Sequence, residues 1–268
     1  MKKKILSVAL LLGAVVLLLC GCGFFVENVY RYDDASSYEG VEGDFSVEGI
    51  AGAEGFSSIE IDWIAGDIKI VQRTDGHPHA IRIDEEFPKA MKQEEYAQLS
   101  FKTRIKDGKL SVKYAKSGAK IPNNFQKTLI VEIPPSIELD SIEVDTVSAN
   151  VTITEISVRE LSVDTVSGAI SMSDTATHGI SVDTVSGNAT ISRCTFSEVE
   201  FDSVSGDAEI VFAEAVGFRC KFETVSGRFV DGFGAEKNGG VYTYGDGSVR
   251  INADTVSGNV TLSQLDSE

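Results

Sequence analysis

A ten-residue segment recurs along the second half of this chain at a nearly constant spacing. In its clearest form it reads VDTVSGNATI, from Val182 to Ile191. Its acidic residue returns after steps of 19, 19, 19, 21 and 31 residues, and the last step contains an insertion around GAEKNGG. The six acidic positions are Asp145, Asp164, Asp183, Asp202, Glu223 and Asp254. Self-similarity at such a period indicates a repeat architecture, in which each copy is one structural unit stacked on the next.

Four columns of the aligned copies are apolar in every copy. They lie three and one residues before the acidic residue, and two and six residues after it. The column one residue before the acid contains Val144, Val163, Val182, Phe201, Phe222 and Ala253, and the column two residues after it contains Val147, Val166, Val185, Val204, Val225 and Val256. Side chains alternate along a strand, so these two columns have opposite parity. If all four columns face a core, the chain must bend at Asp-Thr, and again between Ile153 and Ile156.

The fold class predicted by this pattern is all-β, a parallel β-solenoid with coils of about 19 residues. At about 3.3 Å per residue the coil perimeter is about 60 Å, which is enough to enclose a filled core, and successive coils stack at about 4.8 Å. Like side chains then lie above like, for example Val144, Val163 and Val182. The glycine of the Ser-Gly pair is expected to need a positive φ, although Ala149 takes this place in the first copy.

We divide the chain into four segments. These are a lipoprotein signal peptide (1–21), a lipidated cysteine with an acidic tether (22–55), an N-terminal β half (56–135) and the β-solenoid repeats (136–268). The N-terminal half has a hairpin signal at Asp107-Gly108, one short helical segment (PKAMKQEEYAQ) and a weaker copy of the motif, DWIAGDIKI, which begins at Asp62. Trp63 replaces the threonine of this copy, and we expect it in the core or at an end of the stack.

The N-terminus has the layout of a secretory signal, with three lysines before an apolar run from Ile5 to Leu19. The run ends in Leu-Cys-Gly-Cys, which resembles the bacterial lipobox. This resemblance implies cleavage before Cys22 and a diacylglycerol on its thiol. Cys20 fits less well, because Leu19 would precede the cut, where a small residue is required. The alternative is an uncleaved transmembrane anchor, because the apolar stretch continues to Val26. Either way, we expect the protein on the extracytoplasmic face of the cell membrane.

The formal net charge of −17 bears on the partners that the chain can bind. A surface this acidic is repelled by phosphate backbones and by anionic lipid headgroups, so we expect no nucleic-acid binding. The acidic side chains between the apolar columns are most simply a solvated face that also keeps coil edges from aggregating. They are Glu143, Glu155, Glu160, Glu198 and Glu200.

The acidic column of the repeat is the principal candidate site. Stacked carboxylates repel by about 1 kcal/mol per neighbour in bulk water, and by more near protein. Hydration and hydrogen bonds would offset this repulsion in a structural ladder, whereas a bridging Ca²⁺ is the alternative. A polysaccharide-cleaving β-helix enzyme places its acids at one part of a groove, whereas here an acid recurs on every coil. We therefore predict no catalytic residues and no obligatory cofactor.

Three smaller features have alternatives of their own. The pairs Thr165 with Ser167 and Thr184 with Ser186 could form an outward hydroxyl array of the ice-binding type, which the bend at Asp-Thr disfavours. His77-Pro78-His79 offers two metal ligands without an evident third, and a solvated loop is the simpler interpretation. Cys194 and Cys220 fall at different places around the coil, so we expect two buried thiols rather than the disulfide that an oxidising compartment permits.

The lipobox, IEIDWIAGDIKI, LIVEIP and the serial DTVSG words together resemble the bacterial putative-adhesin family of β-strand-repeat proteins, over about Phe56 to Leu262. The resemblance implies a right-handed or similar parallel β-solenoid on an exported, often lipid-anchored protein, and it supplies no catalytic residues. We expect a non-enzymatic adhesion or interaction scaffold, whose partner is an envelope protein or a glycan. Relatives associated with envelope-stress signalling provide the alternative, a sensory or regulatory component of such a system.

Overall fold

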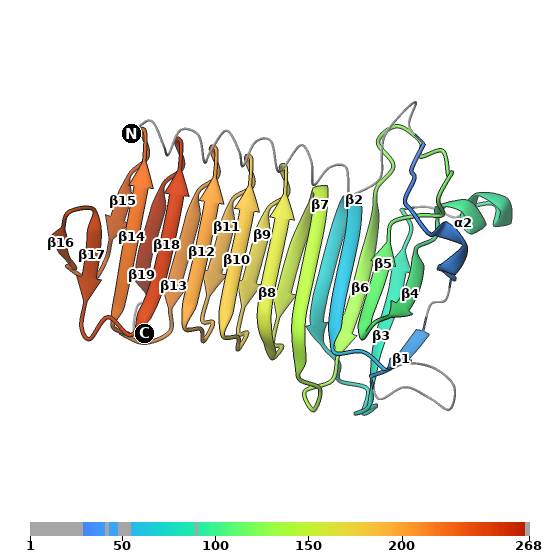
Figure 1. Cartoon of the computed structure of the whole chain (residues 1–268), viewed down its shortest axis with the longest axis horizontal. Coiled ribbons are helices and arrows are strands. Elements are labelled where there is room, and N and C mark those ends of the chain that lie inside the picture. Colours follow the sequence, from blue (N-terminus) through green and yellow to red (C-terminus); the bar gives the residue numbers. More distant parts are fainter. Residues whose placement is uncertain (1–28, 41–42, 48–54, 89–90, 266–268) are drawn as a thin grey trace.

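The computed structural model describes residues 29–40, 43–47, 55–88 and 91–265. The described chain forms one long, mostly parallel sheet that winds into a rod (Figure 1). Its helical parts are a 3-10 turn (Ala35–Ser37) and the short helix α2 (Gln93–Leu99), which overlaps the second half of the segment predicted to be helical. None of the described helices is both long and apolar enough to span a bilayer. The signal peptide, Cys22 and much of the tether lie outside the described residues.

The first part of the rod contains β1 (Gly43–Ser46), β2 (Ser58–Gln72), β3 (Ala80–Glu86), β4 (Lys102–Lys106), β5 (Lys109–Lys113) and β6 (Lys127–Ile133). The middle contains β7 (Leu139–Thr154), β8 (Val158–Thr165), β9 (Ile170–Ser173), β10 (Gly179–Thr184), β11 (Ala189–Ser192), β12 (Glu198–Ser203) and β13 (Ala208–Phe212). The far end contains β14 (Phe218–Thr224), β15 (Phe229–Asp231), β16 (Glu236–Asn238), β17 (Val241–Tyr244), β18 (Val249–Thr255) and β19 (Val260–Gln264).

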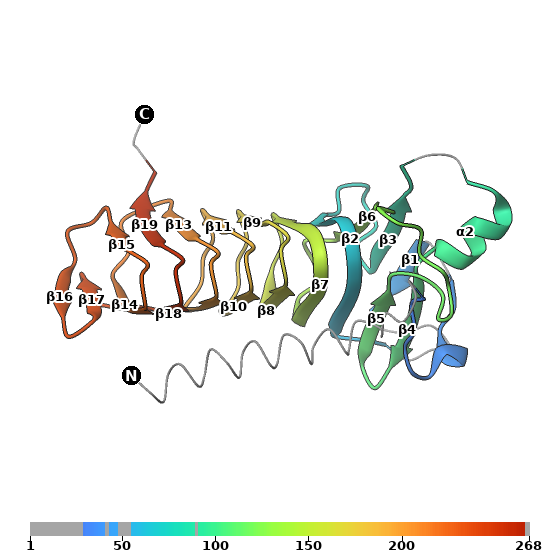
Figure 2. The same ribbon diagram turned by 90° about the horizontal axis from the view of Figure 1, so that it is seen from above.

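The repeats stack in parallel and in register, which confirms the predicted β-solenoid. Val144 pairs with Val163, Val163 with Val182, and Val182 with Phe201. Each coil that follows β7 contributes one strand to each of two walls, with β8, β10 and β12 in one wall and β9, β11 and β13 in the other (Figure 2). The apolar columns three and one residues before the acid, together with the column six residues after it, fill the space between the walls, except that Phe229 is only partly buried.

The spatial order of the coils differs from their order in the sequence at both ends of the rod. β18 lies between β12 and β14, and β19 lies between β13 and β15. The expectation that the copies stack in sequence order is therefore wrong for the last two. At the other end, β2 lies between β7 on one side and β5 and β6 on the other. The first and the last coil are thus both interior.

The chain reaches its last interior position by crossing over itself at Gly217. A Cβ atom at Gly217 would clash with the side chain and the backbone nitrogen of Asp246, in the turn between β17 and β18. The Gly217 carbonyl in turn accepts a hydrogen bond from the Val249 N–H, at 3.0 Å. Glycine at this position therefore leaves the room that the crossing segment needs.

Each end of the rod is covered by residues that interrupt the repeat. At the far end β17 pairs antiparallel with β14, and the Tyr242 ring stacks on Phe229 with centroids 3.9 Å apart. At the other end β4 and β5 form the predicted hairpin, with Asp107 and Gly108 both at positive φ. Trp63 is fully buried there, as predicted, 4.8 Å from the Tyr114 ring.

The valine column that follows the acid faces outward, contrary to the prediction. Val225 is 72% exposed, and the equivalent valines of the other coils are half-buried on the outer surface. The threonines of the inner coils point inward instead: Thr184 is 0% exposed, whereas Thr224 of the outermost coil is exposed. Strand alternation therefore continues through Asp-Thr, and the first bend lies between the valine and the glycine. The second bend falls where it was predicted, at Glu155, Asp174 and Arg193, which all have positive φ.

The buried threonines close this bend. The Gly187 N–H donates to Thr184 Oγ1 at 2.7 Å, and the Gly168 N–H donates to Thr165 Oγ1 at 3.1 Å. The motif glycines do not have the positive φ that we expected. They are needed because a Cβ atom would clash with the carbonyl oxygen of the neighbouring coil. Since the threonines point inward while Ser167 and Ser186 are exposed, the outward hydroxyl array does not form.

Candidate functional site

The six acidic repeat positions lie in one row across the outer face of the rod. Register pairing joins Asp145 to Asp164, Asp164 to Asp183, and Asp183 to Asp202. Because of the interior last coil, the row then continues through Asp254 to Glu223 rather than in sequence order. In the other direction Asp62 of β2 pairs with Asp145, so the weaker motif copy extends the row.

A lysine, which the sequence analysis missed, closes the row at the β5 end. Lys113 pairs in register with Asp62, and their side chains form an ion pair. Beside it, Lys109 Nζ lies 2.8 Å from a carboxylate oxygen of Glu60. The signal was present in the sequence, because LSVKY matches the apolar spacing of IEVDT, with Lys113 at the acidic position and Tyr114 at the threonine position.

The carboxyl groups in the middle of the row hold protons more tightly than ordinary aspartates. Burial raises the pKa of Asp145 to about 6, and the nearby Glu143 contributes. Burial, followed by the charges of neighbouring aspartates, raises the pKa of Asp164 and of Asp202 to about 7. Burial also raises the pKa of Asp183. Asp145, Asp164 and Asp202 therefore titrate near neutral pH.

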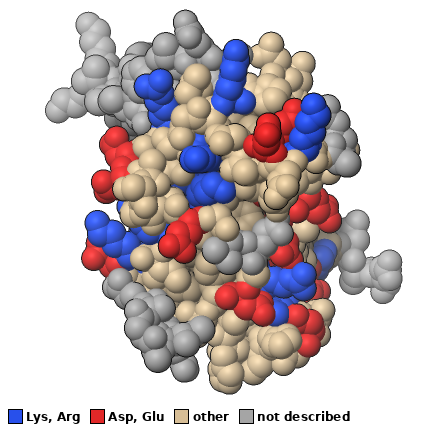
Figure 3. Space-filling model, turned by 90° about the vertical axis from the view of Figure 1, so that its right-hand side faces the viewer, with Lys and Arg blue, Asp and Glu red and all other residues tan. Residues whose placement is uncertain are grey.

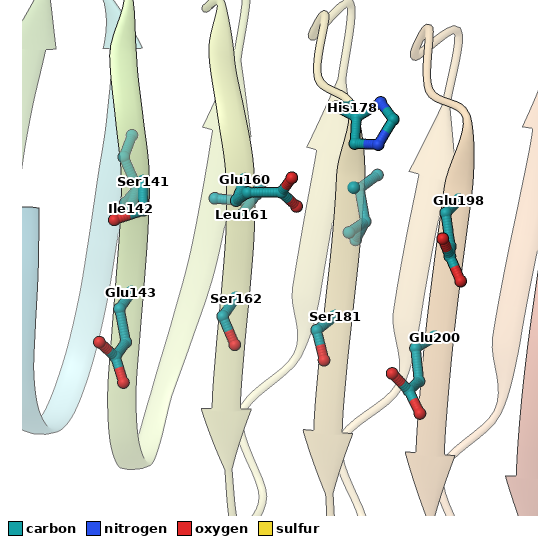
Figure 4. Close-up of a pocket in the computed structure, with 12 residues that line it drawn as sticks. Ser141, Ile142, Glu143, Glu160, Leu161, Ser162, His178, Ser181, Glu198 and Glu200 are labelled. Atoms are coloured by element: carbon teal, nitrogen blue, oxygen red, sulfur yellow. The ribbon is translucent and has the colours of Figure 1, made fainter. Parts of the chain in front are cut away.

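A hollow of about 370 Å³ lies beside the row, across β7, β8, β10 and β12. Four glutamates and His178 line it, together with serines and backbone (Figure 4). Glu160 extends sideways from β8 toward β10, where Gly179 has no side chain and leaves it room. Arg250 lies 3.1 Å from Glu198 at one edge of the hollow. The glutamates are Glu143, Glu160, Glu198 and Glu200.

The charge of the hollow is mainly negative, unlike that of the end of the rod that contains α2. Figure 3 looks onto that end, and its Lys and Arg side chains are interspersed with Asp and Glu. Around the hollow the charged side chains are mainly carboxylates, which come from β7, β8 and β12. This face therefore favours positively charged groups by simple electrostatics.

Metal binding finds little support in the described part of the chain. Among its residues, no three His, Cys, Asp or Glu side chains gather closely enough to hold a metal ion. This includes the acidic row, so the Ca²⁺ alternative has no ligand cluster there. His77 and His79 are both exposed on a loop, which agrees with the interpretation of this motif as a solvated loop.

Cys194 and Cys220, the cysteines of the described residues, are free thiols, but only one of them is buried as predicted. Cys220 is buried and belongs to the column three residues before the acid, whereas Cys194 is only partly buried. Burial raises the pKa of the Cys220 thiol to about 12 and also raises that of Cys194. Both thiols therefore stay protonated and weakly nucleophilic near neutral pH.

The fold and the outer acidic face define a parallel β-solenoid with a repeated, charged surface. Residues 56–214 match the family model described as Toastrack DUF4097, which covers more than half of the chain. The protein belongs to this family.

Several solved structures resemble the chain. One is a putative cell adhesion protein from Clostridium sporogenes, which is 15% identical with a TM-score of 0.49, the match covering 85% of this chain and 100% of that one. A putative adhesin from Bacteroides fragilis is 17% identical with a TM-score of 0.41, over 85% and 97% of the two chains. A putative lipid binding protein from Parabacteroides distasonis is 12% identical with a TM-score of 0.39, over 88% and 100%. A comparison with curated proteins gives no match.

Proposed function

We propose that this protein is a non-enzymatic interaction scaffold, tethered to the extracytoplasmic face of the cell membrane through lipidated Cys22. Its acidic outer face is the surface that meets a partner. The observation that carries this proposal is the hollow across β7, β8, β10 and β12, where glutamates from three of these strands line one surface. Four carboxylates spread over several strands resemble an extended binding surface more than a single acid–base pair at a cleft, which supports a role without catalysis.

The chemistry of this face fits a basic polypeptide segment of an envelope or external protein. Lysine and arginine side chains reach across several strands, and they match carboxylates by charge. Such contacts lie in water, so each one contributes about 0.5 kcal/mol and is screened by salt. Affinity then depends on the number of carboxylates that the partner meets together.

A direct test uses an eight-residue peptide of alternating Lys and Ser as the probe, with the mature chain kept in solution by Cys22→Ser. The triple variant Glu143→Gln, Glu160→Gln and Glu200→Gln is expected to bind it about tenfold more weakly at low salt, measured by isothermal titration calorimetry. The control variant carries Glu209→Gln, Glu214→Gln and Glu236→Gln, three exposed positions away from the hollow. Both variants have the same net charge, so equal losses of affinity would assign the binding to net charge rather than to this surface.

The tether has its own test in a bacterium that carries the lipoprotein pathway. Cys22→Ala is expected to move the protein from the membrane fraction to the soluble fraction. In the unmodified chain, mass spectrometry of the N-terminal peptide should find a diacylglycerol on Cys22. Cys20→Ala is the control, and it should leave the protein in the membrane fraction. Retention of the Cys22→Ala protein in the membrane fraction would instead support the uncleaved transmembrane anchor.

A sensory role in the cell envelope is the second candidate. The observation that favours it is the aspartate row, whose carboxyl groups titrate near neutral pH. Crosslinking on intact cells separates the two roles. Membrane signalling proteins recovered with the chain would favour the sensor, and glycans or proteins from outside the cell would favour the adhesion scaffold.

A further inference from the structure

We propose that the aspartate row of β7, β8, β10 and β12 is a proton-operated switch of the acidic outer face. The row consists of Asp145, Asp164, Asp183 and Asp202. At mildly acidic pH these carboxyl groups share protons and the coils stack with little repulsion. As the pH rises, the protons leave, the face gains negative charge, and the stack becomes less stable. The effect on a partner rests on the function proposed above, whereas the effect on the fold does not.

The geometry of the row places like groups side by side on neighbouring coils. Register pairing puts the four aspartates on adjacent parallel strands, about 4.8 Å apart along the rod. Two ionised carboxyl groups at this spacing repel each other, and a proton on one of them removes that repulsion.

Two oxygen atoms of the row support the same conclusion independently. Oδ1 of Asp145 and Oδ1 of Asp164 are buried, and neither has a hydrogen-bond partner. An ionised carboxylate needs donors or water at both oxygens, so an oxygen without either disfavours the charged form. A proton on the carboxyl group removes that cost.

The charges around the row favour protonation over most of its length. Positive charge acts on the Asp145 end, from Lys113 and Lys109 of β5. Lys113 is already paired with Asp62, and at the opposite end Lys221 lies 3.0 Å from Glu223. The acidic neighbours that face the row are Glu60 and Asp62 on β2, Glu143 on β7, Glu200 on β12 and Asp254 on β18.

The sign of the pH effect follows from the raised pKa values. In the unfolded chain an aspartate has a pKa of about 3.9, whereas in the fold the pKa is about 6 for Asp145 and about 7 for Asp164 and Asp202. The folded state therefore binds these protons more tightly than the unfolded state. The stability that they contribute is fully present below about pH 4, and it is lost as the pH rises through about 6 to 7.

The test compares the double variant Asp164→Asn and Asp183→Asn with the double control Glu209→Gln and Glu214→Gln. In the unmodified chain and the control, the unfolding temperature is expected to fall by about 3 °C or more between pH 5.5 and pH 8. The row variant should show a flatter profile and unfold at a higher temperature than the unmodified chain at pH 8. Asp145→Asn alone serves as a second variant if the double variant does not fold. Identical profiles for row and control variants would overturn the proposal.

A spectroscopic readout reports the protons directly. At pH 6.5 the infrared spectrum of the unmodified chain is expected to contain the C=O stretch of protonated carboxyl groups, and the row variant should lose most of this band. Absence of the band at pH 6.5 in the unmodified chain would also overturn the proposal.

The Lys-Ser peptide then separates the switch from the proposed function. The affinity of the unmodified chain for it should rise about fivefold between pH 5.5 and pH 8, and the row variant should lose this rise. If the infrared band is present but the peptide does not bind at any pH, the proposed function fails and the switch stands. If the peptide binds equally at every pH and the infrared band is absent, the switch fails and the proposed function stands.

Discussion

Replacement of Lys127 by methionine is expected to lower the free energy of unfolding by about 3–5 kcal/mol. The side chains of Lys127 and Glu85 are both 0% exposed and form an ion pair. Lys127 Nζ also donates to the Leu99 carbonyl at 2.7 Å, and it lies 4.7 Å from the ring centroids of Trp63 and Tyr114. Methionine fills much of the space but leaves the Glu85 carboxylate as a buried charge without its cation, which is the costly change.

Urea unfolding measures this loss, and the fluorescence of Trp63, the single tryptophan, reports on the same region. Lys116→Met is the matched control, because Lys116 is exposed, and its effect should stay within about 0.5 kcal/mol. Adding Glu85→Gln to Lys127→Met should recover part of the loss, because the amide is neutral and its oxygen can still accept from the Phe101 N–H. Equal effects of Lys127→Met and Lys116→Met would contradict the structural role given to this pair.

Gly187→Ala is expected to destabilise the protein by about 1–3 kcal/mol. The new Cβ atom would clash with the carbonyl oxygen of Gly168 on the neighbouring coil and lie 2.8 Å from Thr184 Oγ1. Backbone atoms of a stacked coil cannot move aside without disturbing the ladder. In a position with room, the same change usually stabilises by about 0.4–1 kcal/mol, because alanine restricts the unfolded chain. The sign of the effect therefore tests the close approach of the coils.

Gly179→Ala is the control for this prediction. Its new Cβ atom would meet only the end of the Glu160 side chain, which is flexible and can rotate away. We expect a change within about 0.5 kcal/mol in the midpoint of urea unfolding. Similar losses at Gly179 and Gly187 would show that the backbone contact between coils is not the cause.

The stack and its register follow from the sequence because a fixed period places each residue type beside its own copy. Whether each column points into the core or toward solvent follows less directly from the sequence. Val147 and its equivalents are apolar in every copy, yet they face outward, because the position of the bend, and not the residue type, sets their parity. Thr146 and its equivalents occupy the interior because backbone three residues later satisfies their hydroxyl groups. The Ala149 N–H donates to Thr146 Oγ1 at 3.1 Å, and Thr255 Oγ1 donates to the Gly258 carbonyl at 2.9 Å. These bonds depend on a turn whose place the apolar pattern alone does not fix.

The order of the coils is also hidden from the sequence. Copies with the same apolar columns fit against any other copy, so similarity does not tell which two are neighbours. Asp254 lies beside Asp202 although Glu223 comes first in the chain. The proton affinity of the candidate row has the same origin, since it depends on burial and on neighbours that only the assembled face brings together. The acidic positions themselves, by contrast, are read from the repeat directly.

The interior positions of the first and the last coil affect how the rod folds and unfolds. In a simple stack the terminal repeat of the chain contacts only one neighbouring repeat, so it can unfold while the rest of the stack remains intact. Here β2 and the β18–β19 coil each pair with strands on both sides. Unfolding either one therefore breaks two ladders of backbone hydrogen bonds. During synthesis from the amino end, the gap between β12 and β14 stays open until the final segment is made. Premature termination would therefore produce a rod that lacks the coil next to its far end, rather than a shorter rod.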